Sequence, residues 1–494
     1  MKITELMQSS AASPSANPTA ADPTSTDPEI AGLTVDSRQV RPGFLFAAWR
    51  GAQTDGRRFA AEAVAKGAAA ILTDDAAALD LDANTRRRVA IITDANPQRR
   101  LALAAARFYG RQPKTIAAVT GTNGKTSVAH FTRELWAALG FGSASLGTLG
   151  LVTPEGRRAG SLTTPDSVAL HHDLAEVAGQ GVDHAAIEAS SHGLDQCRLD
   201  GVEIVAAAFT NLTRDHLDYH RTMEAYRTAK ERLFAVLLPP RGAAILNADS
   251  DEFTRLGALC KTRGQTVIAY GAADAADLRI AARKPERGGQ VLSLDLFGAR
   301  HEIVLPLVGE FQAMNALAAL GLAVATGSKL EPAAAALERL SPVPGRLQFV
   351  GEANRASVFV DFAHTPDALA TVLTALRPHA ERRLVVVFGA GGDRDRGKRP
   401  QMGQVATELA DRVYVTDDNP RTEDAAEIRR AVLAAAPGAV EFGDRRAAIA
   451  AAIAELGPGD VLVLAGKGHE SGQIVGTETL PFDDVEVARE FIAI

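Results

Sequence analysis

The segment that most constrains the fold is residues 115–127, T-I-A-A-V-T-G-T-N-G-K-T-S. An apolar run typical of a buried strand leads into a turn with two glycines, and residues 128–139 follow with helical periodicity. Strand, glycine-rich turn and helix in this order are typical of a phosphate-binding loop in an α/β domain. Glycines allow backbone N–H groups to converge on phosphate oxygens, and the helix amino terminus adds a favourable field.

The loop departs from the general pattern G-x-x-x-x-G-K-[ST], because Val119 stands where the first glycine is expected. The alternative is an ordinary strand-to-helix turn that carries Gly-Lys-Thr. The surrounding strand and helix favour phosphate binding. In that interpretation Lys125 reaches the terminal phosphates, and the hydroxyl of Thr126 binds Mg²⁺.

Length and composition limit the classes of protein. A chain of 494 residues with a net charge of −7 predicts two to four domains, with no sign of nucleic-acid binding or membrane-surface binding. No apolar run is long enough for a membrane span, and no export signal is recognised at the N-terminus. Cys197 and Cys260 are the only cysteines, so we expect no disulfide framework and a cytoplasmic location.

The order of apolar and polar segments predicts an α/β protein. We expect a disordered lead-in over residues 1–29 and three domains over 30–113, 114–342 and 343–494. Alternating strands and helices predict mostly parallel sheets covered on both faces, with an antiparallel appendage at 286–305. The predicted strands are 44–49, 69–73, 89–93, 185–188, 204–210, 243–247, 384–388, 412–416 and 461–465, and helices are predicted at 59–66 and 98–109.

Polar clusters follow several predicted strands, where ligands bind in open α/β sheets. Glu188 ends one strand and could hold Mg²⁺ near the phosphate loop, although the run after it could equally be a helix cap. His216 lies among aspartates in 211–220, a composition that suggests metal or proton chemistry, whereas His220 reads as a surface residue. By its local sequence alone, Lys230 reads as a solvated helix lysine.

Three loops of the last domain carry glycine and charge: 389–400, 417–421 and 466–470. They offer Arg394, Arg421 and Glu470 at strand ends. Arginine can bind a carboxylate through two hydrogen bonds, and a glutamate can bind an ammonium group. Together these side chains suit a zwitterion such as an amino acid, and the alternative is exposed loop charge.

These motifs, in this order, resemble the Mur ligase family, whose members build the peptide of bacterial cell-wall precursors. The resemblance covers nearly all of the chain after residue 30. It rests on D-S-R at 36–38, G-T-N-G-K-T at 121–126, T-T-P-D at 163–166, E-A-S-S-H-G-L at 188–194, T-R-D-H-L-D-Y-H at 213–220, G-R at 345–346, D-F-A-H-T-P-D-A-L at 361–369, G-G-D-R-D at 391–395, D-N-P-R at 418–421 and G-K-G-H-E at 466–470.

The resemblance implies an N-terminal domain for a UDP-sugar, a central ATPase and a C-terminal Rossmann-like domain for an amino acid. It is strongest to members that add meso-diaminopimelate to UDP-N-acetylmuramoyl-L-Ala-D-Glu, using ATP and Mg²⁺ and passing through an acyl phosphate. We expect a monomer with these small-molecule substrates. The alternatives are a lysine-adding ligase of the same step, a folylpolyglutamate synthase, and a nucleotide-binding regulatory protein without catalysis.

The resemblance also implies residue roles. Catalytic roles fall to Lys125, Glu188, His216 and Lys230, and metal binding to Thr126, Glu188, His216 and a carbamylated Lys230. The ATP-binding set is Gly121, Thr122, Asn123, Gly124, Lys125, Thr126, Ser127, Asn247, Arg346 and Asp361. The UDP-muramoyl-dipeptide set is Val35, Ser37, Gly51, Ala52, Gln53, Thr163, Thr164, Ser190, Gln196 and Arg198. The diaminopimelate set is Arg394, Asp418, Asn419, Pro420, Arg421, Gly466 and Glu470.

Overall fold

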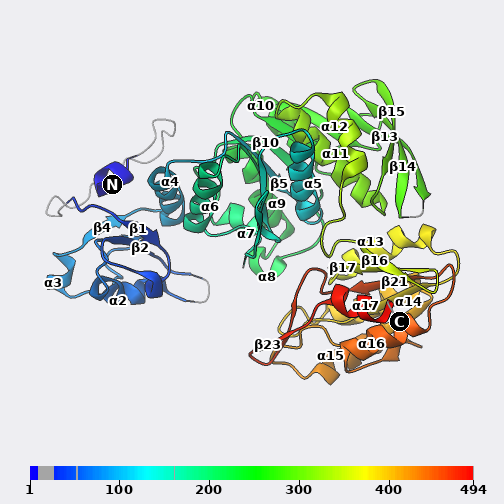
Figure 1. Ribbon diagram of the computed structural model, residues 1–494. Coiled ribbons are helices and arrows are strands. Elements are labelled where there is room, and N and C mark those ends of the chain that lie inside the picture. The colour runs from blue at the N-terminus through cyan, green and yellow to red at the C-terminus, as the bar shows by residue number, and fades with distance from the viewer. Residues whose placement is uncertain (9–26, 52–53, 161, 287, 493–494) are drawn as a thin grey trace. The chain divides into compact units, whose positions relative to one another are not determined.

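The computed structural model describes residues 1–8, 27–51, 54–160, 162–286, 288–492 (Figure 1). Its contacts divide the chain into two compact units. The first comprises residues 1–125, 140–246 and 250–267, and the second comprises residues 126–139, 247–249 and 268–494. No helix in the described ranges combines the length and hydropathy that a membrane span requires.

The first unit begins with a four-stranded parallel sheet in the order β1-β2-β3-β4. The predicted strands here are confirmed to within a residue. The elements are β1 (Gly32–Thr34), β2 (Phe44–Ala48), β3 (Ala70–Thr73), β4 (Ala90–Thr93), α2 (Ala60–Ala65), α3 (Ala83–Arg86) and α4 (Pro97–Tyr109). Asn96 caps α4 by accepting from Arg99 N, and Gly110 ends it in the left-handed conformation.

The expectation that residues 1–29 stay outside the core is wrong for the first of them. Helix α1 (Ile3–Leu6) buries Ile3 and Leu6 in the same apolar cluster as Leu33 and Leu45. The backbone N–H of Ile3 donates to Pro28 O at 3.0 Å. Two apolar side chains one turn apart were enough to join this core, and residues 9–26 lie outside the described part of the chain.

The largest sheet has the strand order β15-β14-β13-β12-β11-β10-β5-β9-β6-β7-β8. Strands β10, β5, β9 and β6 are parallel neighbours, and Val119 of β5 pairs with Glu188 of β9 while Thr120 pairs with Phe209 of β10. The carboxyl ends of these strands therefore meet at one edge. The strands are β5 (Thr115–Thr120), β6 (Ser143–Gly147), β7 (Gly150–Thr153), β8 (Gly156–Arg158), β9 (His184–Glu188), β10 (Ile204–Phe209), β11 (Ala243–Asn247) and β12 (Thr266–Gly271).

The helices of this region follow the glycine loop and the later strands. They are α5 (Lys125–Ala138), α6 (Ser167–Gly179), α7 (Ser191–Asp195), α8 (Leu217–His220), α9 (Met223–Arg232) and α10 (Phe253–Thr262). Strands β13 (Leu278–Glu286), β14 (Gly289–Leu296) and β15 (Ala299–Leu305) pair antiparallel. The predicted appendage is therefore confirmed, but it begins at Leu278 and not at residue 286. Helices α11 (Glu310–Ala325) and α12 (Leu330–Ala336) come next, and α11 is buried along most of its length.

The second unit ends with a six-stranded sheet in the order β16-β17-β21-β18-β19-β20. The elements are β16 (Gln348–Ala353), β17 (Ala356–Asp361), α13 (Pro366–Leu376), β18 (Leu384–Phe388), α14 (Lys398–Leu409), β19 (Arg412–Val415), α15 (Ala425–Leu433), β20 (Val440–Glu441), α16 (Arg445–Ala454), β21 (Val461–Ala465) and α17 (Asp484–Ile492). A separate hairpin is formed by β22 (Gly472–Val475) and β23 (Glu478–Pro481).

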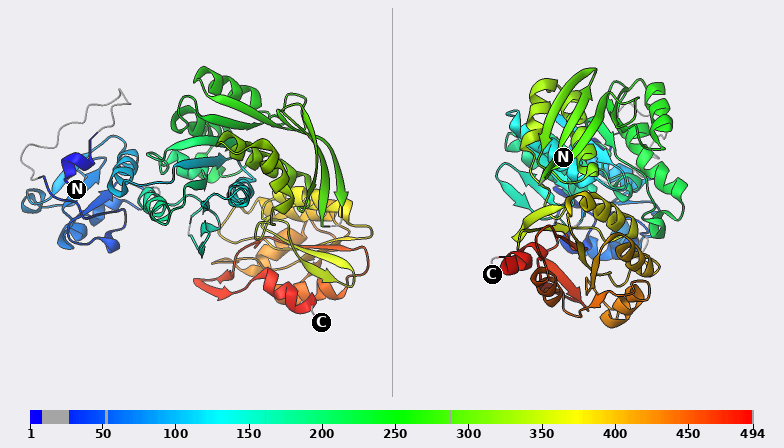
Figure 2. Two further views of the ribbon diagram at one scale, coloured as in Figure 1. Left: turned by 45° about the horizontal axis from the view of Figure 1, so that its top comes forward. Right: turned by 90° about the vertical axis from the view of Figure 1, so that its right-hand side faces the viewer.

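Alternate residues of these strands face two different cores. Val386 and Val463 pack with α13, α14 and α15, whereas Val385 and Leu462 pack with α16 and α17. Helices therefore cover both faces of the sheet, as predicted (Figures 1 and 2). Phe388 pairs with both Ala465 and Val415, so β18, β19 and β21 end at the same level. The three charged loops leave from that edge.

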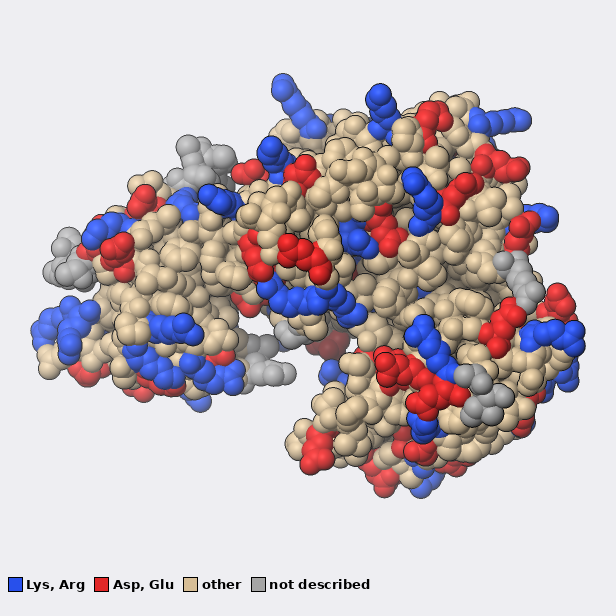
Figure 3. Space-filling model, viewed as in Figure 1, with Lys and Arg blue, Asp and Glu red and all other residues tan. Residues whose placement is uncertain are grey.

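The surface charge is mixed. On the face shown in Figure 3, basic and acidic side chains are interspersed among the described residues, and no continuous basic surface is seen on that face.

A buried imidazole on α6 predicts a pH dependence of stability. Burial lowers the pKa of His171 from 6.5 to about 4, and its Nε2 lies 2.9 Å from Asp200 O, where a neutral ring can donate. Between these pH values the unfolded chain binds a proton that the folded chain does not. The free energy of unfolding should therefore fall as the pH falls from 6.5 to about 4, by about 3 kcal/mol in total from this group.

The measurement compares thermal midpoints of wild type and His171→Gln at about pH 7 and about pH 4.5. We expect the wild-type midpoint to fall further than that of the variant. His172→Gln is the matched control, because that side chain is the next residue and is 55% exposed. Equal falls in wild type and His171→Gln would contradict the prediction.

Candidate active site

The glycine loop is held against the end of β10. Gly121 and Gly124 adopt φ of 149° and 88°, which favour glycine. A Cβ on Gly121 would lie 1.9 Å from Thr210 Oγ1, so no side chain fits there. The Thr210 hydroxyl donates to Asn123 O at 2.5 Å, and Asn123 N donates to Asn211 Oδ1 at 2.9 Å. The loop shape is thus fixed by the neighbouring strand as well as by its own glycines.

Two lysines converge on the loop. Lys125 Nζ donates to Gly121 O at 2.9 Å and to Thr122 O at 2.8 Å, and Lys230 Nζ donates to Gly121 O at 2.7 Å. Lys230 is only 1% exposed, which excludes the alternative of a solvated helix lysine. Burial, and next the charge of Lys125, hold the pKa of Lys230 well below its usual value. A neutral amine is therefore favoured at this position.

A buried tyrosine supports both the loop and Lys230. Tyr226 lies one helical turn before Lys230 on α9, and its ring centre is 4.3 Å from Lys230 Nζ. Its hydroxyl donates to Thr122 Oγ1 at 3.2 Å. The sequence analysis missed Tyr226, and the only signal was its spacing of four residues from Lys230.

His216 precedes α8 in the left-handed conformation, with φ of 54°. Its ring centre lies 6.1 Å from that of Tyr226 and 4.9 Å from that of His192. Burial is the main cause that lowers the pKa of His216, so the neutral ring, with a free nitrogen lone pair, is favoured. His220 is buried on α8, which corrects its interpretation as a surface residue.

Glu188 is buried at the end of β9 and oriented by a residue that the sequence did not mark. Its Oε1 accepts from Thr148 N at 2.7 Å, and its Oε2 accepts from Thr148 Oγ1 at 3.1 Å. A Cβ on Gly147 would lie 2.0 Å from Oε1, so the carboxylate occupies the space that this glycine leaves. Gly147 and Thr148 stand in S-A-S-L-G-T, and nothing in that local pattern indicates their role.

The structure brings together all five expected muramoyl-peptide residues of the central region. The Thr163 hydroxyl lies 3.1 Å from that of Thr148, and Thr164 Oγ1 donates to Glu188 O at 2.6 Å. Ser190 Oγ lies 3.0 Å from Thr164 Oγ1 and accepts from Gly193 N, so Ser190 is a helix cap as well. Arg198 joins them by donating to Thr164 O and to Gln196 Oε1.

The expected uridine-binding residues lie in the first domain. Val35 follows β1 and is 40% exposed, whereas Ser37 is buried and its hydroxyl donates to Glu62 Oε2 at 3.4 Å. Gly51 N donates to Thr54 O at 3.0 Å. Ala52 and Gln53 lie outside the described residues.

The remaining expected ATP residues belong to the second unit. Arg346 stacks its guanidinium 4.5 Å from the ring centre of Phe362. Asp361 is buried and accepts from the backbone N–H groups of residues 347 and 363 at 2.7 and 2.8 Å. Burial raises the pKa of Asp361, while Arg346 opposes that rise. Asn247 ends β11 and accepts from Asp249 N. Their contact with ATP stays a prediction.

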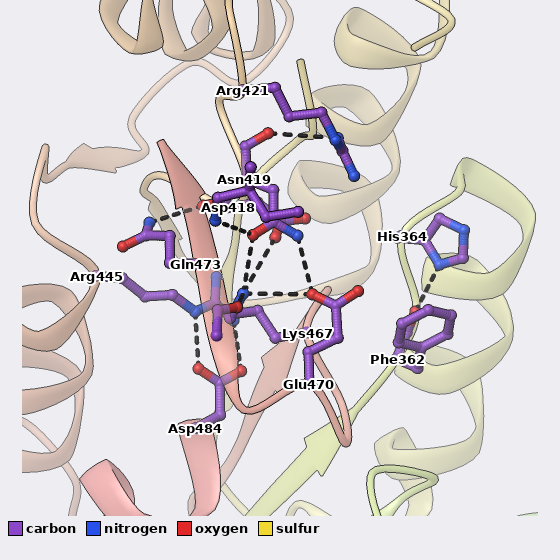
Figure 4. A network of polar contacts seen from close by, with 12 residues as sticks. Phe362, His364, Asp418, Asn419, Arg421, Arg445, Lys467, Glu470, Gln473 and Asp484 are labelled. Atoms are coloured by element: carbon purple, nitrogen blue, oxygen red, sulfur yellow. Dashed lines mark hydrogen bonds and ion pairs between the residues drawn. The ribbon is translucent and has the colours of Figure 1, made fainter. Parts of the chain in front are cut away.

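The expected amino-acid site is a connected polar network at the edge of the C-terminal sheet (Figure 4). Asn419 Nδ2 donates to Glu470 Oε2 at 2.9 Å, and the buried Asp418 lies beside Gly466. Lys467, which the sequence analysis quoted within G-K-G-H-E but gave no role, is fully buried among them. The motif itself was therefore the signal for this residue.

Arg421 is positioned by glycines. It follows the buried Pro420 and adopts a left-handed φ of 53°, and its Nη1 donates to Gly392 O at 2.8 Å. A Cβ on Gly391 would lie 3.0 Å from Nη1, so this glycine makes room for the guanidinium. Arg394 is exposed on the same glycine loop, and the one hydrogen bond described for its side chain goes to the carbonyl of its neighbour Asp393.

Comparison with known proteins identifies the class. The glycine loop lies at one sheet edge and the polar network around Lys467 at the edge of another sheet. Three family descriptions match in succession: "Mur ligase family, catalytic domain" over residues 29–109, "Mur ligase middle domain" over 119–323 and "Mur ligase, glutamate ligase domain" over 345–468. The chain belongs to the Mur ligase family.

Similar relatives share one name, UDP-N-acetylmuramoyl-L-alanyl-D-glutamate–2,6-diaminopimelate ligase. The protein of that name from Bradyrhizobium diazoefficiens is 55% identical over 94% of this chain and 95% of its own length. That from Caulobacter vibrioides is 53% identical over 93% and 94%. A solved structure of a ligase with this name is 35% identical, covers 94% of this chain and 95% of its own, and superposes with a TM-score of 0.70.

Proposed function

We propose that this chain is an ATP-dependent ligase that joins meso-2,6-diaminopimelate to the D-Glu carboxylate of UDP-N-acetylmuramoyl-L-Ala-D-Glu in peptidoglycan synthesis. The observation that carries the proposal is the 53–55% identity, over nearly the whole chain, to relatives that bear this name. The name of those relatives favours diaminopimelate over lysine and a muramoyl peptide over folate.

The proposed chemistry has two steps. The D-Glu carboxylate oxygen attacks the γ-phosphorus of ATP, which forms an acyl phosphate and releases ADP. The amine of diaminopimelate then attacks the acyl carbon, the bond between that carbon and the bridging phosphate oxygen breaks, and inorganic phosphate leaves as the amine gives up its proton to water. Lys125 would balance the negative charge of the transferred phosphoryl group. Thr163, Thr164, Ser190, Gln196 and Arg198 would orient the acceptor carboxylate.

The residues beside the loop fit Mg²⁺. Glu188 contributes carboxylate oxygens and Thr126 a hydroxyl oxygen, and oxygen ligands suit this ion. When bound, Mg²⁺ would neutralise phosphate charge. Thr148, by its two hydrogen bonds to Glu188, fixes the direction in which the carboxylate faces.

The proposed function is tested by leaving out one component at a time. We expect repeated ADP release only when ATP, Mg²⁺, UDP-N-acetylmuramoyl-L-Ala-D-Glu and diaminopimelate are all present. Without diaminopimelate the acyl phosphate is not consumed, so no more than about one ADP per enzyme should be released. The measurement is coupled ADP release with mass analysis of the tripeptide product. Turnover with a folate and glutamate in place of the muramoyl substrate would overturn the proposal.

We further propose that Lys230 is carbamylated in the active enzyme. Its buried amine has a lowered pKa, and a neutral amine is the form that adds CO₂. The carbamate nitrogen keeps one N–H, which can go on donating to Gly121 O, while the new carboxylate supplies an anionic oxygen ligand for Mg²⁺ that an amine lacks.

We expect Lys230→Ala to be almost inactive and partly rescued by formate or acetate, which replace the missing carboxylate. Enzyme exchanged into ¹³C-bicarbonate should show a carbamate carbon signal that Lys230→Ala lacks. Lys125→Ala is the matched control, because formate cannot replace an ammonium group. Full wild-type activity in CO₂-depleted buffer, without the carbamate signal, would contradict this prediction.

A further inference from the structure

The network in Figure 4 is built around the ammonium group of Lys467. This residue follows β21, lies between two glycines with positive φ, and is 0% exposed. Its Nζ donates to Gly472 O at 2.6 Å, to Asn419 Oδ1 at 3.2 Å and to Glu470 Oε2 at 3.3 Å. Three acceptors match the three protons of an ammonium group, so a charge that is costly to bury is fully satisfied.

Lys467 determines which way the Asn419 amide faces. Asn419 Oδ1 accepts from Lys467 Nζ and from Ile474 N, the latter at 2.9 Å. Both partners can only donate, so the amide oxygen must face them and the NH₂ group must face the other way. In the reversed orientation the NH₂ group would meet two donors, one of them charged.

The same arrangement assigns roles to the two oxygens of Glu470. The hydrogen bonds from Asn419 Nδ2 and Lys467 Nζ both reach Oε2. Glu470 Oε1 is therefore the oxygen turned away from these two donors, and the side chain is 35% exposed. Asn419 Nδ2 also has a second proton that Glu470 does not use. The edge of the network offers an N–H donor and a carboxylate oxygen side by side.

We propose that Lys467 is a positioning residue that sets the polarity of the amino-acid site, so that position 419 donates to a carboxylate of the ligand and position 470 accepts from its ammonium group. This inference rests on the proposed function, because it takes the amino acid bound here to be the attacking substrate. Two donors hold the Asn419 oxygen, Lys467 Nζ and Ile474 N. Without the ammonium group only Ile474 N is left. The amide can then turn, and the preference for carboxylate at that position is lost.

The β22 strand extends this positioning to Arg421. Ile474 O accepts from Arg421 N at 3.0 Å, and Gly476 N donates to Arg421 O at 2.8 Å. Gln473 Nε2 donates to Asp418 O at 2.7 Å. The hairpin therefore binds the backbone of the D-N-P-R segment on one side, while Lys467 ties the hairpin, through Gly472 O, to the side chains of the site.

The test is Lys467→Met, which keeps an unbranched side chain, one atom shorter, and removes the charge. We expect the KM for diaminopimelate to rise about ten- to a hundredfold, the usual worth of a hydrogen bond to a charged group. The KM values for ATP and UDP-N-acetylmuramoyl-L-Ala-D-Glu should not change. The ratio of kcat/KM for diaminopimelate to kcat/KM for lysine should become smaller. Calorimetric titration with diaminopimelate should show the same loss of affinity.

Arg383→Met is the matched control. Arg383 donates to the buried carboxylate of Asp460 at 2.7 Å. These two residues precede β18 and β21, so they lie at the amino ends of the strands, away from the network at the carboxyl ends. Its replacement likewise exchanges a paired cation for an apolar chain. We expect a lower thermal midpoint and an unchanged KM for diaminopimelate. A purely structural role of Lys467 would give the same result as this control, and that outcome would overturn the inference.

Lys467→Gln is a second variant that tests the same inference if Lys467→Met does not fold. A glutamine amide can donate to Asn419 Oδ1 without charge, so the KM for diaminopimelate should lie between those of wild type and Lys467→Met. An unchanged KM in Lys467→Gln would overturn the inference even if Lys467→Met is insoluble. A wild-type enzyme that does not use diaminopimelate would instead contradict the proposed function, so the two failures are distinguishable.

Discussion

Replacing Lys125 by Ala should lower ATP-dependent ligation by at least roughly 10²–10³-fold, because one preorganised charge at the transferred phosphoryl group is lost. In the structure the Lys125 ammonium is held by the carbonyls of Gly121 and Thr122. It therefore lies against the loop to which the phosphates of ATP are expected to bind. The measurement is kcat for ADP release under saturating substrates.

The control for this variant is Lys261→Ala, at an exposed position in the last turn of α10. Both variants should keep the wild-type thermal midpoint to within a few degrees, because Lys125 bonds to loop carbonyls and supports no core packing. Near-normal turnover of Lys125→Ala would remove the assignment of the ATP site.

Wild-type enzyme should use meso-diaminopimelate and nearly ignore L-lysine, and Arg421→Ala should remove that preference. Diaminopimelate differs from lysine by a second α-carboxylate. Arg421 is half-buried, and its Nη1 is fixed by Gly392 O, so the other donors of the guanidinium can bind that carboxylate. With lysine, Arg421 would be desolvated without a partner, which costs about 2–5 kcal/mol, or roughly thirty- to several-thousand-fold in discrimination.

The measurement is kcat/KM for both amino acids in wild type and Arg421→Ala. Arg396→Ala is the matched control, because Arg396 pairs with Glu423 at 3.0 Å on the same domain but is 75% exposed. The control should keep the preference, and the KM values for ATP and the muramoyl substrate should stay unchanged in both variants. Equal use of lysine by wild type would show that D-N-P-R does not select the amino acid, although the ligase assignment could stand.

Much of the fold followed from local sequence. Strands such as Leu384–Phe388 and Val461–Ala465 were predicted to the residue, because buried parallel strands are short apolar runs with polar loops at their ends. The glycine loop was predictable because its glycines and Lys125 are adjacent in the chain, whereas the support that Thr210 and Asn211 give it was not. Helix α1 was missed because its four residues are stable only through a core contributed by distant strands.

The residues that orient the site residues were harder to predict from the sequence. Thr148 and Glu188 are forty positions apart, and only the pairing of β6 with β9 brings them together. Tyr226 and Lys467 hold other site residues in place. Their signals, a spacing of four residues from Lys230 and a place within G-K-G-H-E, mark the positions but not what the side chains contact. The sequence could suggest which groups meet the substrates, whereas the contacts that orient those groups depend on tertiary structure.

The left-handed backbone of Arg421 also bears on how the specificity of this enzyme can evolve. With φ of 53°, most replacements would keep a backbone cost of roughly 1–2 kcal/mol and lose the bond to Gly392 O that helps to offset it. Glycine and asparagine tolerate this conformation best. We therefore expect mutational paths toward another amino acid to pass through Gly or Asn at position 421, and Arg421→Gly to be better folded than Arg421→Ala.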